Sequence, residues 1–402
     1  MGLELLSETQ FKTLKWSLTC SAILSVLGSL LIMWHASNKL KRPYHRILFM
    51  LSFTDLVSSA VVAVLSPVRD AVLKPCLVCT LDGFVAVSMV YGSAFYNASL
   101  SVFFLVTIKY SYSDRKITRR VEPFLHGISL GYPMTLAIIG AGLQMYNPLN
   151  ATLSCWINAY PENCEWDDTI ECQRGEGAFL FALFAAAIPL AIIWTTLFWN
   201  NTAMYCFVRG LEKRSSQYVM RGSIPSNVMI GRSTHPPGRV VMADVGVDNE
   251  VGTAGADSNA AGVDGVDSQA KATSTTSRQS TEAVRIMSRR ATPANPDTSP
   301  NKTQQIMIQS LLYVLAFFMV FIFSGIVFVL SSTDPVGLDS GKYFPIQVAE
   351  SVLYPLQGFF DSFVYLRPRY VRFRTYFPDR SSWFAIRKAA FTRIPPGEAT
   401  AS

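Results

Sequence analysis

The chain has 402 residues, of which 50% are hydrophobic and 16% charged, with a formal net charge of +7 at pH 7. Its mean hydropathy is positive despite one long polar interruption, which excludes an ordinary soluble domain of this length. The composition predicts that most of the chain lies in lipid.

Seven predominantly apolar segments are long enough to cross a bilayer, which takes roughly 20 residues per helix. The first lacks a basic start and a small-residue cleavage site, so we expect it to stay in the chain rather than act as a signal peptide. The predicted spans are 14–36, 46–68, 81–108, 123–146, 177–208, 304–332 and 343–366. The sequence therefore predicts an all-α membrane protein, a seven-transmembrane helix bundle.

Basic residues gather in alternate loops between these spans. Segment 37–46 has four Lys or Arg and no acid, 109–122 has five bases against two acids, and the tail from Arg367 has eight against two. Segment 147–176 has six acids and one base. Cytoplasmic loops retain Lys and Arg, so the N-terminus is predicted outside and the C-terminus inside. This topology accounts for the positive charge, and no nucleic-acid partner is inferred from it.

Segment 209–303 separates helices one to five, in 1–208, from helices six and seven, in 304–366. It is rich in Ala, Gly, Ser, Thr and Asp and has too few large apolar residues for a core, so we predict a disordered third cytoplasmic loop. Thr292 follows Arg289 and Arg290, and Ser299 precedes a proline; both are predicted phosphorylation sites. The arginines are explained equally well by the tendency of cytoplasmic segments beside membrane helices to retain basic residues.

Five cysteines fall on the predicted outer side, where disulfides persist: Cys76, Cys79, Cys155, Cys164 and Cys172. An odd number leaves at least one unpaired. The sequon Asn150-Ala-Thr lies in the second outer loop, and Asn150 is a predicted glycosylation site.

Three acids lie in the interior of predicted spans: Asp55, Glu350 and Asp361. An ionisable group at that depth costs several kcal/mol unless it is paired, hydrated or protonated, so each is a functional candidate. The alternative is a structural polar contact between helices. Tyr365 lies four residues after Asp361 and therefore on the same helical face.

Several short motifs occur in the order of a known superfamily. "CTLDGF" at 79–84, "SCWI" at 154–157 and "PLQGFF" at 355–360 resemble the cyclic-AMP-receptor-like (class E) G-protein-coupled receptors and, more distantly, the secretin-like class. "LSFTDL" at 51–56 resembles the second helix of both class E and rhodopsin-like receptors. The resemblance covers most of the membrane part and none of 209–303.

The resemblance implies a multi-pass plasma-membrane receptor. It would bind an extracellular small-molecule ligand among its helices and activate a heterotrimeric G protein, with kinases and arrestin-like proteins as further partners. No cofactor is implied.

The resemblance also implies a set of outer contacts. Cys79 would pair with Cys155, and Cys164 with Cys172, although Cys76 could replace either member of the second pair. The ligand cavity would be lined by residues of the third and seventh helices and the second outer loop, favouring a donor-bearing or cationic group. These residues are Asp82, Tyr91, Phe95, Trp156 and Glu350.

In the core, Asp361 and Tyr365 match the polar residue and tyrosine of the rhodopsin-like seventh-helix motif, here without its proline. Asp55 would be a neighbour of Asp361, and the two carboxyl groups would share a proton or a sodium ion as a switch. No other metal is expected. The acid-arginine pair that ends the third helix of rhodopsin-like receptors is missing at the corresponding depth.

The cytoplasmic face is predicted to contact the G protein through Lys109, Tyr110, Arg209, Arg289, Arg290 and Arg367. The tail 367–402 begins "RPRYVRFRTYF", which predicts an amphipathic helix lying in the membrane interface, with Pro368 in its first turn.

Other classes fit less well. A retinal protein needs a lysine in the last helix, and the interior of 343–366 has none. A transporter or channel is the alternative function, because Pro133, Pro189 and the buried acids could line a path, but no three-helix repeat is found. An enzyme is not expected, since the chain has no phosphate-binding Gly-rich loop and no metal-ligand spacing.

Overall fold

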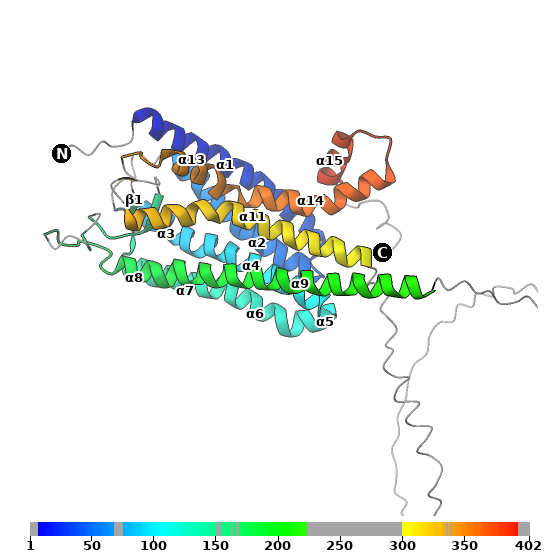
Figure 1. The fold of residues 1–402 in the computed structure, drawn as a ribbon. Coiled ribbons are helices and arrows are strands. Elements are labelled where there is room, and N and C mark those ends of the chain that lie inside the picture. Colours follow the sequence, from blue (N-terminus) through cyan, green and yellow to red (C-terminus); the bar gives the residue numbers. More distant parts are fainter. Residues whose placement is uncertain are drawn as a thin grey trace, which may run out of the picture. The chain divides into compact units, whose positions relative to one another are not determined.

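The structure is a computed structural model, which describes residues 7–67, 75–149, 154–161, 164–165, 169–222, 300–334, 337 and 340–392. The chain divides into two compact units, Met1–Ser215 with Ser299–Ser402, and Ser216–Thr298. The helices of the first unit form a bundle (Figure 1).

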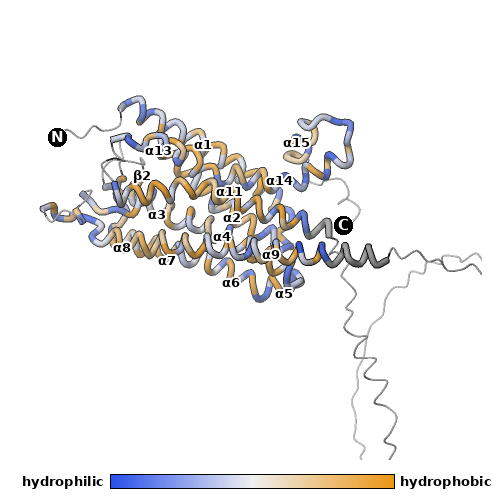
Figure 2. The backbone as a smooth tube through the Cα atoms, in the orientation of Figure 1, coloured by the Kyte–Doolittle hydropathy of each residue, from blue (hydrophilic) through white to orange (hydrophobic). Residues whose placement is uncertain are grey.

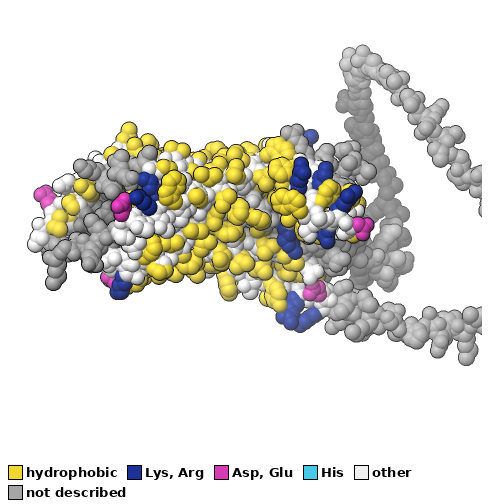
Figure 3. All heavy atoms as spheres, turned by 90° about the horizontal axis from the view of Figure 1, so that it is seen from above, with side chains coloured by type: hydrophobic (Ala, Val, Ile, Leu, Met, Phe, Trp, Pro, Cys, Tyr) yellow, Lys and Arg dark blue, Asp and Glu magenta, His cyan; other side chains and the backbone are white. Residues whose placement is uncertain are grey.

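Six helices of the described residues are long and apolar enough to cross a membrane. They are Glu8–Lys39, Pro43–Leu65, Leu77–Ile108, Asp114–Gly142, Ala178–Lys213 and Gln304–Ser331. Hydrophobic residues run along the middle of the helices (Figure 2), and hydrophobic side chains cover the middle of the visible face, with Lys and Arg toward its ends (Figure 3). The first six predicted spans are therefore present as apolar helices.

Three of these helices contain π-helical turns, which divide them into shorter labelled elements. The full order is α1 Glu8–Ala36, α2 Pro43–Leu65, α3 Leu77–Val85, α4 Tyr91–Ile108, α5 Asp114–Lys116, α6 Glu122–His126, α7 Tyr132–Gly142, β1 Tyr146–Leu149, β2 Ser154–Ile157, α8 Ala178–Ala182, α9 Ile188–Gly222, α11 Pro300–Thr333, α13 Phe344–Leu353, α14 Gln357–Tyr376 and α15 Ser382–Phe391.

The predicted seventh span, 343–366, is two helices rather than one. A 3-10 turn at Tyr354–Leu356 separates α13 from α14, and Pro355 in that turn has no amide hydrogen to donate. The two pieces pack on α1 and α11. That α13 and α14 together cross the membrane stays a prediction.

The tail differs from the prediction. Pro368 lies inside α14, which continues to Tyr376, so the arginine-rich stretch extends this helix and does not open a new one. The separate tail helix is α15, whose Ala385 and Ala389 pack against Tyr370 and Phe373 of α14. The small alanine side chains of α15 allow this close packing. Their spacing of four residues was visible in the sequence, but the prediction for the tail was based on its arginines.

Helices occupy both ends of the segment that was predicted to be disordered. α9 continues through 209–222 and α11 begins at Pro300, so the prediction of disorder is wrong for these residues. A helix that is already formed adds a residue at little cost, which extends it beyond its apolar part. Residues 223–299 lie outside the described part of the chain.

One end of the bundle carries the antiparallel hairpin of β1 and β2, in which Pro148 faces Cys155. Tyr146 wedges this hairpin between α3 and α7, and its hydroxyl donates to the carbonyl of Ala137 at 3.0 Å. A Cβ on Gly83 or Gly140 would lie within 2.6 Å of the Tyr146 side chain. These glycines leave the space that the tyrosine fills.

Candidate functional site

A cavity of about 180 Å³ lies among the helices beside the hairpin. It is lined from nearly every side of the bundle, by α1, α2, α3, α4, α9, α11, α13 and the hairpin. Most of the lining is aliphatic or aromatic, with a few polar groups, the usual character of a small-molecule site.

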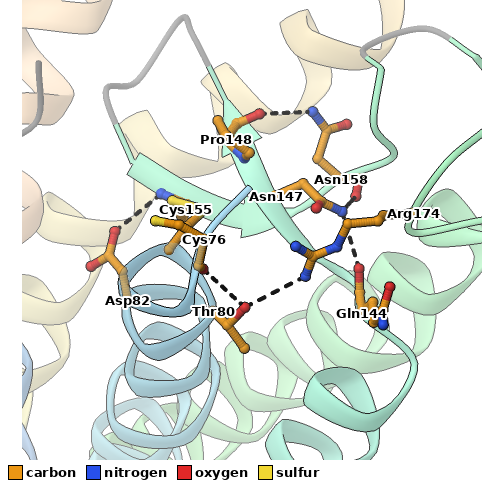
Figure 4. The surroundings of a disulfide bond; sticks show 10 residues. Cys76, Thr80, Asp82, Gln144, Asn147, Pro148, Cys155, Asn158 and Arg174 are labelled. Carbon is orange, nitrogen blue, oxygen red and sulfur yellow. Dashed lines mark hydrogen bonds between the residues drawn. A yellow bond between two sulfur atoms is a disulfide. The ribbon is translucent and has the colours of Figure 1, made fainter. Parts of the chain in front are cut away.

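A disulfide holds the hairpin against the third helix. Cys79 of α3 is bonded to Cys155 of β2, and Cys155 lines the cavity. Asp82 adds a second tie, since its Oδ2 accepts the Cys155 backbone N–H at 3.0 Å (Figure 4). Both predicted disulfides are confirmed, because Cys164 and Cys172 are also bonded. Cys76 is half-buried and has no disulfide partner.

Four of the five predicted ligand-binding residues line the cavity: Asp82, Tyr91, Trp156 and Glu350. The rings of Tyr91 and Trp156 are stacked, with centroids 6.0 Å apart and planes 23° apart. Phe95 does not line the cavity. It packs in a hydrophobic cluster one turn deeper, with its ring edge-on to Tyr132 at 5.5 Å.

Sequence reasoning missed other polar lining residues on α13 and the following turn. Gln347, Ser351 and Tyr354 share the cavity face with Glu350. Their spacing of three or four residues puts them on one side of a helix. A row of polar residues along one face of an apolar segment would have predicted that this face borders a cavity.

Asp55 and Asp361 are neighbours in the core, as predicted. Both are buried, and their carboxyl groups interact with each other. Asp55 also accepts a hydrogen bond from the hydroxyl of Ser93, and Asp361 accepts one from Gln357 Nε2 at 3.3 Å. Because two adjacent buried carboxyl groups cost free energy, this pair is a functional candidate.

A second, small cavity of about 20 Å³ reaches Asp55 of this pair, whereas Asp361 does not line it. Asp55, Ser93 and Gln357 line it, and it shares Ser58, Val62, Val90, Phe321 and Tyr354 with the larger cavity. Its size suits about one water molecule or a small ion. The cavity beside the hairpin and the small cavity at Asp55 thus have five lining residues in common.

Tyr365 lies toward the opposite end of the bundle from the hairpin. It is buried in the large hydrophobic cluster and interacts with Tyr44 of α2 and Tyr313 of α11. Asp361 interacts with the same two tyrosines. Asp361 and Tyr365 of α14 therefore lie four residues apart, the first beside Asp55 and the second in the cluster with Tyr44 and Tyr313.

The end of the bundle opposite the hairpin bears the described G-protein-contact candidates (Figure 1). Lys109 and Tyr110 are exposed just after α4, Arg209 is exposed on α9 and donates to the hydroxyl of Tyr205 at 3.0 Å, and Arg367 is half-buried in α14. The remaining predicted modification and contact residues lie outside the described part of the chain: Asn150, Arg289, Arg290, Thr292 and Ser299.

An ion pair at this end was not anticipated. Arg46 of α2 pairs with Glu122 of α6, and Arg46 Nη2 also donates to Thr118 at 2.9 Å. Glu122 lies 3.5 Å from His126, whose Nδ1 is 2.9 Å from the hydroxyl of Tyr96. Both partners lie in segments that the sequence analysis described only by their excess of basic residues.

At the hairpin end, the turn between α11 and α13 holds its own ion pair. Lys342 Nζ lies 2.9 Å from Asp334 Oδ2, which also accepts from Tyr343 at 2.9 Å. The Lys342 ammonium lowers the pKa of Asp334, with help from the backbone N–H of Gly337, and Asp334 raises the pKa of Lys342. Neither residue lines the cavity.

Comparison with known proteins identifies the fold. No family model matches the chain, and no curated protein matches its sequence. The crystal structure of squid rhodopsin is similar with a TM-score of 0.54 and 12% identity, over 98% of this chain and 94% of that chain. The chain therefore has a fold similar to that of squid rhodopsin, and its several apolar helices fit a multi-pass membrane protein.

Proposed function

We propose that this chain is a seven-helix receptor of the plasma membrane that binds an extracellular small molecule and activates a heterotrimeric G protein. The observation that carries the proposal is the cavity under the disulfide-tied hairpin, on a rhodopsin-like fold, with the acid pair next to it. In this proposal α13 and α14 form the seventh span, and the N-terminus is outside. The class E motifs support the same reading.

The charge pattern supports this orientation. Basic segments 37–46 and 109–122 and the described part of the tail, 367–392, all lie at the end opposite the hairpin, which would face the cytoplasm. The disulfides lie at the hairpin end, which would then face an oxidising medium.

Signal transmission would pass through the acid pair and the buried cluster around Tyr365. A ligand in the larger cavity would contact side chains shared with the small cavity, which is lined by Asp55, the neighbour of Asp361. Two adjacent carboxyl groups in a low dielectric cannot both ionise cheaply, so they would hold a shared proton or a sodium ion. Ligand binding that reorganises this pair would shift the equilibrium toward an active arrangement at Tyr365 and the cytoplasmic ends.

A transporter or channel is the second candidate, favoured by the buried acids and the break between α13 and α14. Light detection through a retinal Schiff base has no support, since none of the described residues that line the cavity is a lysine.

The decisive experiment reconstitutes the full chain in lipid nanodiscs with purified G proteins and measures nucleotide exchange across a small-molecule library. We expect at least one compound to stimulate exchange, and Glu350→Gln to weaken its potency at normal expression. Glu8→Gln, an exposed acid on α1, is the matched control. Ligand-driven solute flux in liposomes, with no exchange on any G protein, would favour the transporter.

A further inference from the structure

We infer that the cavity beside the hairpin takes an organic cation, a small amine with an apolar or aromatic body, and rejects anions such as phosphates. The inference rests on the proposed receptor function and names the ligand class of its site.

The described lining of the cavity contains acidic side chains and no basic ones. Asp82 enters from α3 and Glu350 from α13, and no Lys, Arg or His occurs among the described residues that line it. A carboxylate within an apolar cavity costs free energy unless a counter-charge compensates it. A bound cation supplies that compensation, whereas a bound anion adds repulsion from two carboxyl groups.

Asp82 and Glu350 differ in their hydrogen-bond partners and therefore in their roles at the site. Asp82 is 6% exposed, and its Oδ2 already accepts the Cys155 N–H, which holds the hairpin. Glu350 is half-buried and lies beside the hydroxyl of Ser324 on α11. Glu350 is therefore the anchor for an ammonium group, and Asp82 contributes chiefly by its field and by positioning the hairpin.

The remaining lining favours an amine with a ring. Tyr91 and Trp156 present a stacked aromatic pair, and an aromatic face attracts a cation within about 6 Å of its centroid. Val61, Leu190 and Phe328 add apolar walls. A volume of about 180 Å³ suits one compact ring with a short side chain.

The basic residues near this end do not make the cavity fit an anion. A phosphate ligand needs Arg or Lys within hydrogen-bonding reach. Arg174 instead contacts Thr80 Oγ1 at 3.5 Å, and Lys342 is paired with Asp334. Neither lines the cavity. Arg69 and Lys74 lie outside the described residues. The described lining thus opposes a cyclic nucleotide.

The test uses three probes that share an indole ring and differ in charge: tryptamine, tryptophol and indole-3-acetate. Binding to the purified full chain in nanodiscs is measured by the melting temperature and by calorimetry, and phenethylamine and benzylamine extend the cationic set. We expect the amines to bind and the neutral and anionic probes to bind at least about tenfold more weakly, the factor for one charged hydrogen bond.

Variants separate charge from shape. Glu350→Gln should weaken tryptamine binding by about tenfold or more, and Glu350→Lys should reverse the preference toward indole-3-acetate. Glu8→Gln should leave all affinities unchanged. The inference is overturned if the neutral or anionic probe binds as tightly as tryptamine to the wild-type chain, or if none of the three amines binds.

A separate exchange assay keeps the two proposals distinguishable. Amine binding without nucleotide exchange on any G protein contradicts the receptor function and leaves the cation site standing. Exchange stimulated by an anion, lost in Glu350→Gln, contradicts the cation site and leaves the receptor function standing.

Discussion

Gly28 of α1 and Gly358 of α14 meet backbone to backbone where these helices cross. A Cβ on Gly28 would lie 2.6 Å from the Gly358 carbonyl oxygen and 2.8 Å from Phe359 Cα. Both are backbone atoms that cannot rotate away. Small residues at such a crossing let membrane helices approach closely.

We therefore expect Gly28→Ala to destabilise the protein by roughly 1–3 kcal/mol, the usual range for overpacking. Thermal unfolding in nanodiscs measures the effect. Gly210→Ala on α9 is the control, since a Cβ there would meet nothing within 4 Å. An unchanged melting temperature for Gly28→Ala would show that the helices do not cross this closely.

The outer disulfides predict a specific peptide map. Under non-reducing conditions, Cys79 should be recovered linked to Cys155 and Cys164 linked to Cys172, with Cys76 available for alkylation. Cys155→Ser should lower the free energy of unfolding by about 2–4 kcal/mol, because the lost link closes a long loop. Recovery of Cys76 in a disulfide would contradict the pairing.

The acid pair predicts energetic coupling. Asp361→Asn should express well, since it removes the repulsion between two buried carboxyl groups. Its activity in the nucleotide-exchange assay should depend less on sodium concentration and pH than that of the wild type. Adding Asp55→Asn should give a stability change that departs from additivity by about 0.5–3 kcal/mol. Combining Asp55→Asn with Asp334→Asn, at the distant turn, should be additive. Additive behaviour in both pairs would mean that the acids act independently.

The docking of the tail helix α15 on α14 should depend on the buried Arg369. Arg369 of α14 donates through Nη1 to His35 Nδ1 at 3.1 Å and through Nη2 to the carbonyl of Thr392. His35 Nε2 in turn lies 2.9 Å from the carbonyl of Ala390. His35 thus carries its hydrogen on Nε2, and the pair satisfies carbonyls at the end of α15.

We expect Arg369→Ala to release α15 and raise the rate of proteolysis between α14 and α15 several-fold. Arg369→Lys should rescue little, because one ammonium cannot reach both acceptors in the fork geometry of a guanidinium. Arg387→Ala, on the exposed face of α15, is the control. Equal cleavage rates for Arg369→Ala and the wild type would contradict this docking.

The turn between α11 and α13 predicts a pH dependence. The pKa of Asp334 is lowered from its ordinary 3.8, chiefly by the hydrogen bond from Lys342. The contribution of this contact is fully present above the ordinary pKa and is lost as the pH falls through the lowered one. Carbon-13 NMR of the Asp334 carboxyl should show a titration midpoint below 3.8 that Lys342→Ala raises and Lys12→Ala leaves alone. A midpoint unaffected by Lys342→Ala would exclude the ion pair in solution.

Much of the architecture followed from local pattern. Runs of apolar residues of spanning length located six helices, since such runs are stable as helices in lipid whatever their neighbours do. The family resemblance located Cys79 and Cys155 and placed Asp55 beside Asp361. Local pattern could not show where α9 ends or that Pro368 lies within a continuing helix, because a helix that is already formed can extend beyond its apolar stretch.

The candidate site divides in the same way. Sequence alone determined that acids lie deep in apolar helices, because their rarity there is visible without any contact. Only the tertiary structure decided that Glu350 lies beside Ser324 in a cavity with Tyr91 and Trp156, while Phe95 packs in another cluster. Which side of a helix faces a cavity depends on the rotation and crossing of its neighbours, and those are set by contacts between residues far apart in the chain.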